Sequence, residues 1–448
     1  MLDPDNALTR LDAALAAARA AGADAADAMY VGDGATSVSV RLGKLEDIGR
    51  AEGEEIGIRV FVGNRSASVS SSDLTVAALR EAAERAVAMA RLAPEDPYAG
   101  LAPAELLASG ALPDLDIHDD TQISAAELKE RAAAAEDAAR SVPGVTNSEG
   151  GGASAGLVVT ALATSTGFRG GKRSTSHGLS ASVLAGTGGD MQRDYAWHSA
   201  RYLADVESAE AIGRRAGERA VARLNPLKLV SAAMPVVFDR RVSASLLGHL
   251  VGAITGSAIA RGTSFLKDKL GQAILPAGLS IIDDPLRPRG LRSRAFDGEG
   301  LPAQRTAIIS QGVLTNWLMD SASARQLGLA PTGHASRGTS GPPGAGTSNL
   351  HLEGGTATPA ELIADIKQGI YVTELIGMGV NGLTGDYSRG ASGFLIENGE
   401  ITRPVAEITI AGNLVAMFAN LAAANDLHFR HASNAPTLRV EGMTVAGS

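Results

Sequence analysis

The sequence predicts an α+β fold, in which N-terminal α/β units with antiparallel sheets and flanking helices precede a β-rich C-terminal domain of mixed short strands and helices. Each of two N-terminal stretches begins and ends with an amphipathic helix, and the strands between them show no βαβ rhythm. The second half carries short strand patterns separated by glycine- and proline-rich loops. A chain of 448 residues exceeds what one hydrophobic core usually serves, so several domains are expected.

The first unit, residues 1–93, opens with a helix, because apolar residues from Leu8 onward recur at helical spacing until Gly22. Apolar and polar residues then alternate, as in half-buried strands, over residues 36–42, 55–62 and 65–72. Asp73 is predicted to cap the N-terminus of a second amphipathic helix, which Pro94 closes.

The second unit, residues 123–225, repeats this plan after a linker at 94–122 that is rich in proline, aspartate and glycine. Helices are predicted over 124–140 and 208–224, with strands over 156–165, 177–186 and 193–203. The closing helices of the two units end in similar sequences, "AAERAVAMARLAP" and "AGERAVARLNP". The two units are therefore expected to form one N-terminal domain.

The third region, residues 226–448, is predicted to be a separate C-terminal domain. A strand over 234–239 precedes a helix over 241–255, and a further helix is predicted over 359–369. Residues 333–349, "GHASRGTSGPPGAGTSN", form a long loop. Loops of this length are usually functional or disordered, so this one is predicted to border a cleft.

Composition excludes several classes of function. The formal net charge of −9 argues against a general nucleic-acid binder, which needs clustered lysine and arginine. The absence of cysteine excludes disulfides, thiol nucleophiles and thiolate-bound zinc. The first residues do not resemble a secretory signal, and no apolar run of about 18 residues is present to span a membrane. A cytoplasmic protein without membrane contact is therefore expected.

Ser154 lies in "GASAG", residues 152–156, which matches the G-x-S-x-G pattern of serine hydrolases. That motif needs a strand before the serine and a helix after it, whereas the strand-like stretch "LVVTALATS" follows here. A glycine-rich turn is the favoured interpretation, and an independent hydrolase that uses Ser154 is kept as an alternative.

Two groups of residues are weighed as metal sites. Residues 114–120, "DLDIHDD", gather four carboxylates around His118, a set that suits a hard cation. His428 and His431 are three residues apart and would share one face of a helix, but the run "HFRH" contains no acidic residue. A solvated acidic linker and a surface histidine pair are the favoured interpretations.

The stretch "SLLGHLVGAITG", residues 245–256, carries one histidine, His249, within the helix predicted over 241–255. A helical zinc-peptidase site needs two imidazoles on one helix and a glutamate beside the first as general base. This stretch offers one imidazole and no carboxylate, and the dipeptide "HE" occurs nowhere in the chain. His249 is therefore interpreted as a structural residue.

Three stretches resemble the TldD/PmbA peptidase family, and its PmbA (TldE) branch in particular. They are "GIRVFVGNRSASVSSSDLT", "FDGEGLPAQRTAIISQGVL" and "GMGVNGLTGDYSRGASGFLIENGEITRPVAEITIAGNL". The resemblance covers about residues 10–445. It implies a two-component cytoplasmic peptidase in which a TldD subunit carries zinc on an H-E-x-x-x-H helix and a C-terminal cysteine. The TldE subunit pairs with it and encloses a cleft.

The metal motif of the family does not carry over to this chain. Its pattern L-L-H-E-x-V-G-H lies over residues 246–253, so Gly248 stands for the first histidine, His249 for the glutamate and Ala253 for the second histidine. No cysteine is present to complete the set. The resemblance thus implies no catalytic residue, metal ligand or cofactor in this chain, and zinc in its partner.

The predicted function is that of the non-catalytic subunit of a TldD–TldE-type metallopeptidase complex acting on peptides or unfolded proteins. The chain is expected to pair with a TldD-like zinc subunit and to hold an extended peptide by strand addition, at glycine-rich strand edges or at residues 333–349. A gyrase-modulator-like regulatory factor, acting through protein contact and without nucleic-acid binding, is the alternative. In isolation the chain is expected to accept a copy of itself as a homodimer.

Overall fold

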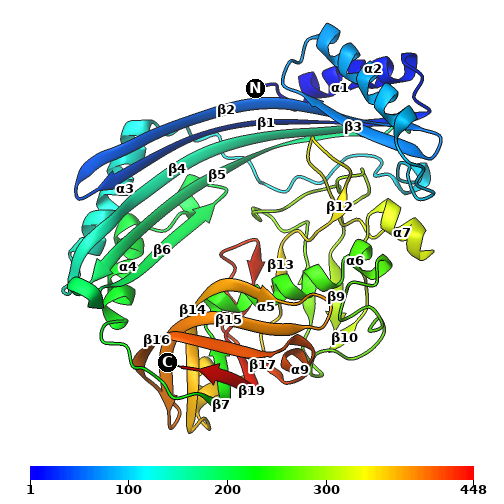
Figure 1. Ribbon diagram of the computed structural model, residues 1–448. Helices are drawn as coiled ribbons and strands as arrows, with labels where there is room; N and C mark the ends of the chain where they lie inside the picture. Colours follow the sequence, from blue (N-terminus) through cyan, green and yellow to red (C-terminus); the bar gives the residue numbers. More distant parts are fainter. Residues whose placement is uncertain (448) are drawn as a thin grey trace.

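The N-terminal half is built on one long, curved antiparallel sheet of six strands (Figure 1). The computed structural model describes residues 1–447. The strand order β3-β2-β1-β4-β5-β6 joins three strands from each of the two N-terminal stretches into a continuous sheet. The strands are β1 (Ala25–Arg41), β2 (Lys44–Val62), β3 (Arg65–Ser71), β4 (Val145–Thr164), β5 (Arg169–Ala185) and β6 (Gln192–Ala200).

Four helices cover one face of this sheet. They are α1 (Pro4–Ala20), α2 (Val76–Leu92), α3 (Ala125–Arg140) and α4 (Ala209–Ala222). On β1, Ala28 and Tyr30 belong to the core beneath α1 and α2, whereas Val38 and Val40 belong to the core beneath α3 and α4. Side chains alternate between the two faces of a strand, so both helix pairs pack on the same face. The opposite face turns toward the C-terminal half (Figure 1).

Strands β1, β2, β4 and β5 are longer than the sequence patterns predict. Strand β4 runs straight through the glycine-rich stretch that was expected to be a turn, so that prediction was wrong. A Cβ atom at Gly151 would lie 2.1 Å from the carbonyl oxygen of Ala132 in α3. Glycine therefore serves here to let a helix approach the sheet, and not to reverse the chain.

Helix α2 begins two residues later than expected. Its N-cap is Thr75, whose hydroxyl accepts a hydrogen bond from the backbone N–H of Ala78 at 3.3 Å. Asp73 instead accepts from the backbone N–H of Thr75 at 2.9 Å. The cap predicted at Asp73 was thus wrong in position, because threonine competes for the same role closer to the first helical turn.

The C-terminal half contains a closed barrel of five strands. The strand order β16-β15-β14-β7-β19 returns on itself, because β19 also pairs with β16. All these pairings are antiparallel except that of β14 with β7. The strands are β7 (Ala232–Phe238), β14 (Gln368–Val380), β15 (Asp386–Glu397), β16 (Glu400–Asn413) and β19 (Leu438–Ala446). Fully buried Phe238, Ile370, Ile410 and Val440 contribute to the core of this half.

Shorter elements surround the barrel. A second sheet has the order β10-β9-β8-β13-β18, with β8 (Ile281–Asp283), β9 (Thr306–Ser310), β10 (Val313–Leu314), β13 (Leu350–Leu352) and β18 (Ser433–Asn434). The remaining elements are α5 (Arg240–Ala253), α6 (Gly256–Ala260), α7 (Ser321–Leu327), β11 (Ala335–Ser336), β12 (Gly344–Ala345), α8 (Pro359–Ile363), α9 (Leu414–Ala419) and β17 (Leu421–Ala423). Helix α8 is shorter than predicted, because the chain turns after Ile363 and enters β14 at Gln368.

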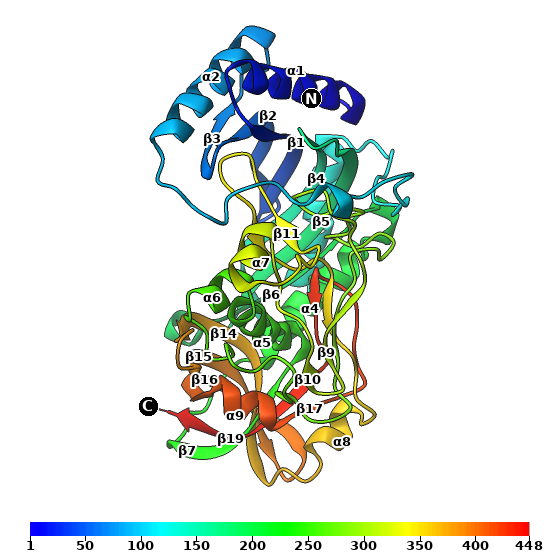
Figure 2. The ribbon, with the colours of Figure 1, turned by 90° about the vertical axis from the view of Figure 1, so that its right-hand side faces the viewer.

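The predicted α+β class is confirmed, with helix-covered antiparallel strands followed by a β-rich C-terminal half. In the side view, the N-terminal sheet and α1 and α2 stand above the barrel, with α7 and β11 between them (Figure 2). No helix in residues 1–447 combines the length and the apolar character needed to cross a membrane.

Candidate functional site

Helix α5 carries the three positions at which a zinc motif would lie. Gly248 and Gly252, one turn apart, are exposed, and no neighbouring element comes within 4 Å of a Cβ atom placed at either residue. Ala253 is buried in the core. The helix therefore presents a strip of bare backbone at its surface, and His249 supplies the one imidazole among the aligned positions.

His249 packs against Tyr387 of β15, in an edge-to-face arrangement with ring centroids 5.8 Å apart. Burial and then the positive charge of Arg389 lower the pKa of His249, so the imidazole is neutral near pH 7. Burial raises the pKa of Tyr387 to about 12. Nε2 of His249, Oη of Tyr387 and Oγ of Ser245 are buried and find no hydrogen-bond partner within the described chain. The sequence gives no sign of Tyr387 as the neighbour of His249, because only the barrel brings the two together.

The hairpin of β14 and β15 forms an exposed apolar edge close to α5. Residues 370–372 of β14 pair with β7, but no strand of the described structure pairs with residues 374–380 on the side away from β15. Ile376 and Leu383 are each 58% exposed and Met378 is 84% exposed. Single exposed apolar side chains are common, whereas a cluster on an open strand edge is typical of a contact surface.

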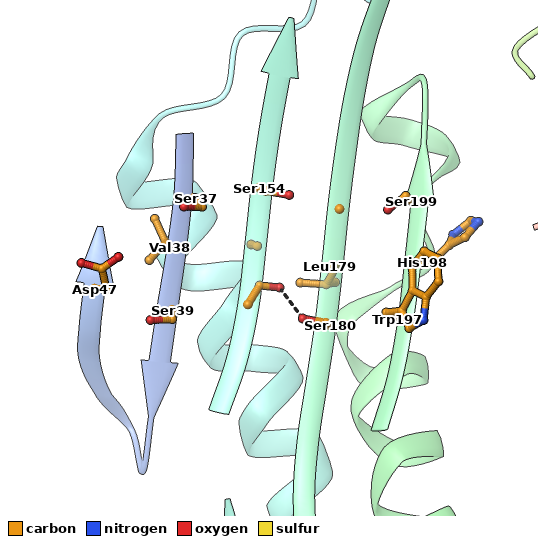
Figure 3. A pocket seen from close by; sticks show the side chains of 13 residues that line it. Ser37, Val38, Ser39, Asp47, Ser154, Leu179, Ser180, Trp197, His198 and Ser199 are labelled. Atoms are coloured by element: carbon orange, nitrogen blue, oxygen red, sulfur yellow. Dashed lines mark hydrogen bonds between the residues drawn. The ribbon is translucent and has the colours of Figure 1, made fainter. Parts of the chain in front are cut away.

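The open face of the N-terminal sheet holds a shallow hollow of about 430 Å³, lined mainly by serine and glycine from β1, β4, β5 and β6 (Figure 3). Ser154 lies there in the middle of β4, paired with Ser37 on one side and Gly178 on the other. His198 lies on β6, two strands away, which places it roughly 10 Å from Ser154. Its Nδ1 already accepts a hydrogen bond from the backbone N–H of Glu207. His177 is the nearer histidine, but it lies opposite Ala155 on β5, so its side chain is on the other face of the sheet from Ser154. A strand in place of an elbow, with no histidine beside Ser154 on its own face, contradicts the serine-hydrolase alternative.

Residues 333–349 fasten the two halves of the molecule together. The guanidinium of Arg337 forms a buried ion pair with Asp27 of β1, and Arg59 of β2 donates to the same carboxylate. Thr339 hydrogen-bonds Glu55, and its carbonyl oxygen occupies the space that a side chain at Gly57 would need. Gly333, at the start of the loop, lines a hollow of about 330 Å³. The middle of the loop packs on the open face of the sheet beside β1 and β2.

Glu299 lies buried near this ion cluster and accepts hydrogen bonds from the backbone N–H and hydroxyl of Ser321, at 2.8 and 2.7 Å. Burial, reinforced by the charge of Asp297, raises the pKa of Glu299 to about 6 from 4.5. Between pH 4.5 and about pH 6 the native state therefore binds more protons than the unfolded state. The free energy of unfolding falls as the pH rises through that interval.

Glu299→Gln is expected to remove this dependence, because glutamine stays neutral. The free energy of unfolding of the variant, relative to the unmodified protein, should rise by about 2 kcal/mol between pH 4 and pH 7. Urea denaturation at the two pH values measures it, with the exposed Glu84→Gln as a matched control. An equal difference at both pH values would contradict the assignment.

The other residues considered as metal ligands in the sequence do not come together as a metal site. Residues 114–120 form no helix or strand, with the ring of His118 only 3.4 Å from Asp120. His428 and His431 lie on a loop, so the shared helix face was wrong. His431 instead packs against Trp197 of β6 in a tilted arrangement, with ring centroids 4.5 Å apart. Nowhere in residues 1–447 do three histidine, aspartate or glutamate side chains gather as a metal site would require.

Comparison with known proteins gives matches along the chain. Residues 26–90, 118–224 and 231–447 match domain 1, the central domain and the C-terminal domain of the PmbA/TldA metallopeptidases. The chain is 41% identical to a protein of Escherichia coli O157:H7 named metalloprotease PmbA, over 97% of this chain and 94% of that protein. It is 36% identical to a metalloprotease PmbA homologue of Haemophilus influenzae, over 92% of this chain and 90% of the homologue.

Two solved structures share the whole fold. One, from Bacteroides thetaiotaomicron and described as a candidate modulator of DNA gyrase, superposes with a TM-score of 0.91 at 29% identity and covers 100% of both chains. The other, TldE from Thermococcus kodakarensis, has a TM-score of 0.83 at 21% identity and covers 98% of this chain and 100% of its own. At 21% identity, the similarity to TldE shows a shared fold only.

Proposed function

This chain belongs to the PmbA branch of the PmbA/TldA metallopeptidase family, and from that premise we propose that it is the zinc-free subunit of a two-chain peptidase. It pairs with a TldD-like, zinc-bearing subunit and takes part in cleaving peptides or unfolded proteins. Its own contribution is to wall the cleft and to hold the substrate while the partner supplies the metal chemistry.

The observation that carries the proposal is the surface of α5. Gly248 and Ala253 occupy the positions of the two histidine ligands, and His249 occupies that of the glutamate base. This donor set does not fit a zinc ion. Gly248 and Gly252 nevertheless keep the helix surface free for close approach. A helix that has lost its ligands but keeps an unobstructed backbone strip suits contact with another chain.

The free edge of β14 supplies the second part of the proposal. Residues 374–380 offer unpaired backbone and exposed apolar side chains beside α5. An extended peptide would add to this edge by main-chain hydrogen bonds, which recognise backbone more than sequence. The edge of β6 suits this less, because Arg219 and Arg430 already donate to the outward carbonyls of Tyr195 and Trp197.

Co-expression with a zinc-bearing TldD-like homologue tests the function. The two chains are expected to co-purify, and peptide cleavage is expected from the pair but from neither chain alone. A chelator should abolish the cleavage. Proteolysis by this chain alone in the presence of chelator, or failure of the two chains to associate, would sink the proposal.

A regulatory role is the second candidate, because the gyrase-modulator description belongs to a structure that matches this chain over its full length. The exposed apolar edge of β14 would equally suit a stable protein partner. Affinity purification from cells separates the two candidates: a stoichiometric zinc-bearing homologue supports the peptidase subunit, and a topoisomerase supports the regulator.

A further inference from the structure

Another cavity, of about 480 Å³, lies where the edge of the N-terminal sheet meets the start of α5. Its walls come from β6, α4, the first turn of α5 and the segment 428–435. It shares Trp197 with the serine-lined hollow of Figure 3. A hollow of this size holds one or two amino-acid residues.

Arginines dominate the lining of this cavity. Its lining holds five guanidiniums and two carboxylates, those of Glu207 and Asp239, and one of the five, that of Arg241, pairs with Asp194 at 3.0 Å. Glu207 is shared by Arg430 and Arg215, at 2.6 and 2.9 Å. The carboxylate of Asp239 accepts hydrogen bonds from the backbone of α5 and from the hydroxyl of Tyr371, and pairs with none of the arginines. The five are Arg215, Arg219, Arg240, Arg241 and Arg430.

Two of these arginines keep donors to spare. Arg219 makes one hydrogen bond, to the carbonyl oxygen of Tyr195 at 3.2 Å, and Arg240 forms no ion pair with any described residue. Burial and then the charge of Arg241 lower the pKa of Arg219. Burial and neighbouring arginines likewise lower the pKa of His428 and of His431. Burial is the larger cause in all three cases, and the charges of the neighbouring arginines act in the same direction.

A flat aromatic wall stands beside the free donors. Trp197 is 41% exposed, and its ring packs on that of His431 in a tilted arrangement with centroids 4.5 Å apart. The ring of Tyr195 lies under the guanidinium of Arg241, at 5.6 Å. An anion that also carries apolar surface can therefore bind the guanidinium donors with its charge and pack its apolar part on the aromatic rings.

We propose that this cavity binds a carboxylate of a peptide, with Arg219 and Arg240 donating to the carboxylate oxygens and Trp197 packing against the adjacent chain. The inference rests on the proposed peptide-handling function and adds a preference to it: substrates with an acidic residue or a free chain end near the bound segment are favoured. A planar guanidinium matches a carboxylate with two parallel N–H···O bonds. Because arginines cap the β6 edge, the ligand is held by its charged group and not by strand pairing.

Trp197 provides the readout, since the chain has two tryptophans and the other, Trp317, is buried. In a Trp317→Phe background, tryptophan emission is titrated with a doubly blocked pentapeptide that carries one glutamate, and with its glutamine twin. The glutamate peptide is expected to bind about tenfold or more tightly than its twin. A third peptide, uncharged except for a free C-terminus, tells a chain end from an acidic side chain as the source of the carboxylate.

Arg219→Gln with Arg240→Gln should remove this preference, whereas Arg214→Gln, on the exposed side of α4, should retain it. Equal binding of the glutamate and glutamine peptides would overturn the proposal. Inorganic phosphate that binds as tightly as the glutamate peptide would also overturn it and would make the cavity a general anion site. All titrations use this chain alone and test only the cavity. Cleavage of a neutral peptide by the two-chain complex tests the proposed function, so failure of one can be told from failure of the other.

Discussion

Asp27→Ala is expected to lower the free energy of unfolding by about 3–5 kcal/mol, because it leaves two buried guanidiniums without a counter-charge. Asp27 is 1% exposed, and its carboxylate faces Arg59 and Arg337 together. Burial opposes its ionisation, but these two guanidiniums outweigh burial and hold the pKa of Asp27 below its usual value. The carboxylate therefore stays charged at neutral pH and is the direct ion-pair partner of both arginines.

The matched control is Asp12→Ala, which removes an exposed carboxylate that pairs with Arg169 at 2.7 Å. Exposed pairs contribute about 1 kcal/mol or less, so the control should unfold almost as the unmodified protein does. Urea denaturation measures both variants, and limited proteolysis follows residues 333–349. Arg337→Met should leave the Asp27–Arg59 pair intact, cost less stability and yet expose this loop to cleavage. Equal stability of the Asp27 and Asp12 variants would contradict this account of the cluster.

Gly248→Phe is expected to reduce the peptidase activity of the two-chain complex at least about 100-fold while leaving this chain folded. A Cβ atom at Gly248 meets no other element within 4 Å, so the isolated chain has room for a large side chain. If α5 lies against the partner or the substrate, as proposed, a phenyl ring fills the space that contact requires. A misplacement of about 1 Å near the chemistry is enough for an effect of this order.

Three comparisons make this result interpretable. Gly248→Ala should raise the free energy of unfolding by about 0.5–1 kcal/mol, because glycine weakens a helix interior. Gly252→Phe, one turn away on the same exposed strip, should act as Gly248→Phe does. Gly189→Phe, at an equally open position outside α5, should leave activity unchanged. Full cleavage activity of the Gly248→Phe complex, with association unchanged in light scattering, would remove α5 from the interface.

The sequence predicts the helices of the N-terminal half and the fold class, because amphipathic spacing and antiparallel alternation are local signals. It underestimates the strands, because residues such as Gly32 and Gly34 interrupt the period-two pattern within β1. The turn predicted at residues 152–156 is the sharper case: its pattern is local, but pairing with β1 and β5 makes it part of β4, and the close approach of α3 requires glycine at the adjacent Gly151. Tertiary packing decides these positions.

The same reason limits prediction of the site. The missing zinc ligands on α5 can be found by comparing residues 246–253 with the family pattern. The buried contact of Arg337 with Asp27 and the stacking of His431 on Trp197 join residues far apart in the sequence. Neither pair carries a spacing that a sequence pattern records, so the arginine-rich cavity is visible only once the chain is folded.

The closed ring of C-terminal strands has a consequence for how the protein forms during synthesis. β7 emerges directly after the N-terminal sheet, but its neighbours are β14 and β19, the last strand of the described chain. The N-terminal sheet can thus fold while translation continues, whereas β7 keeps at least one edge open until β19 has been made. Throughout that wait the apolar stretch "MPVVF" is exposed, and this interval is where a nascent chain would most need protection by a chaperone.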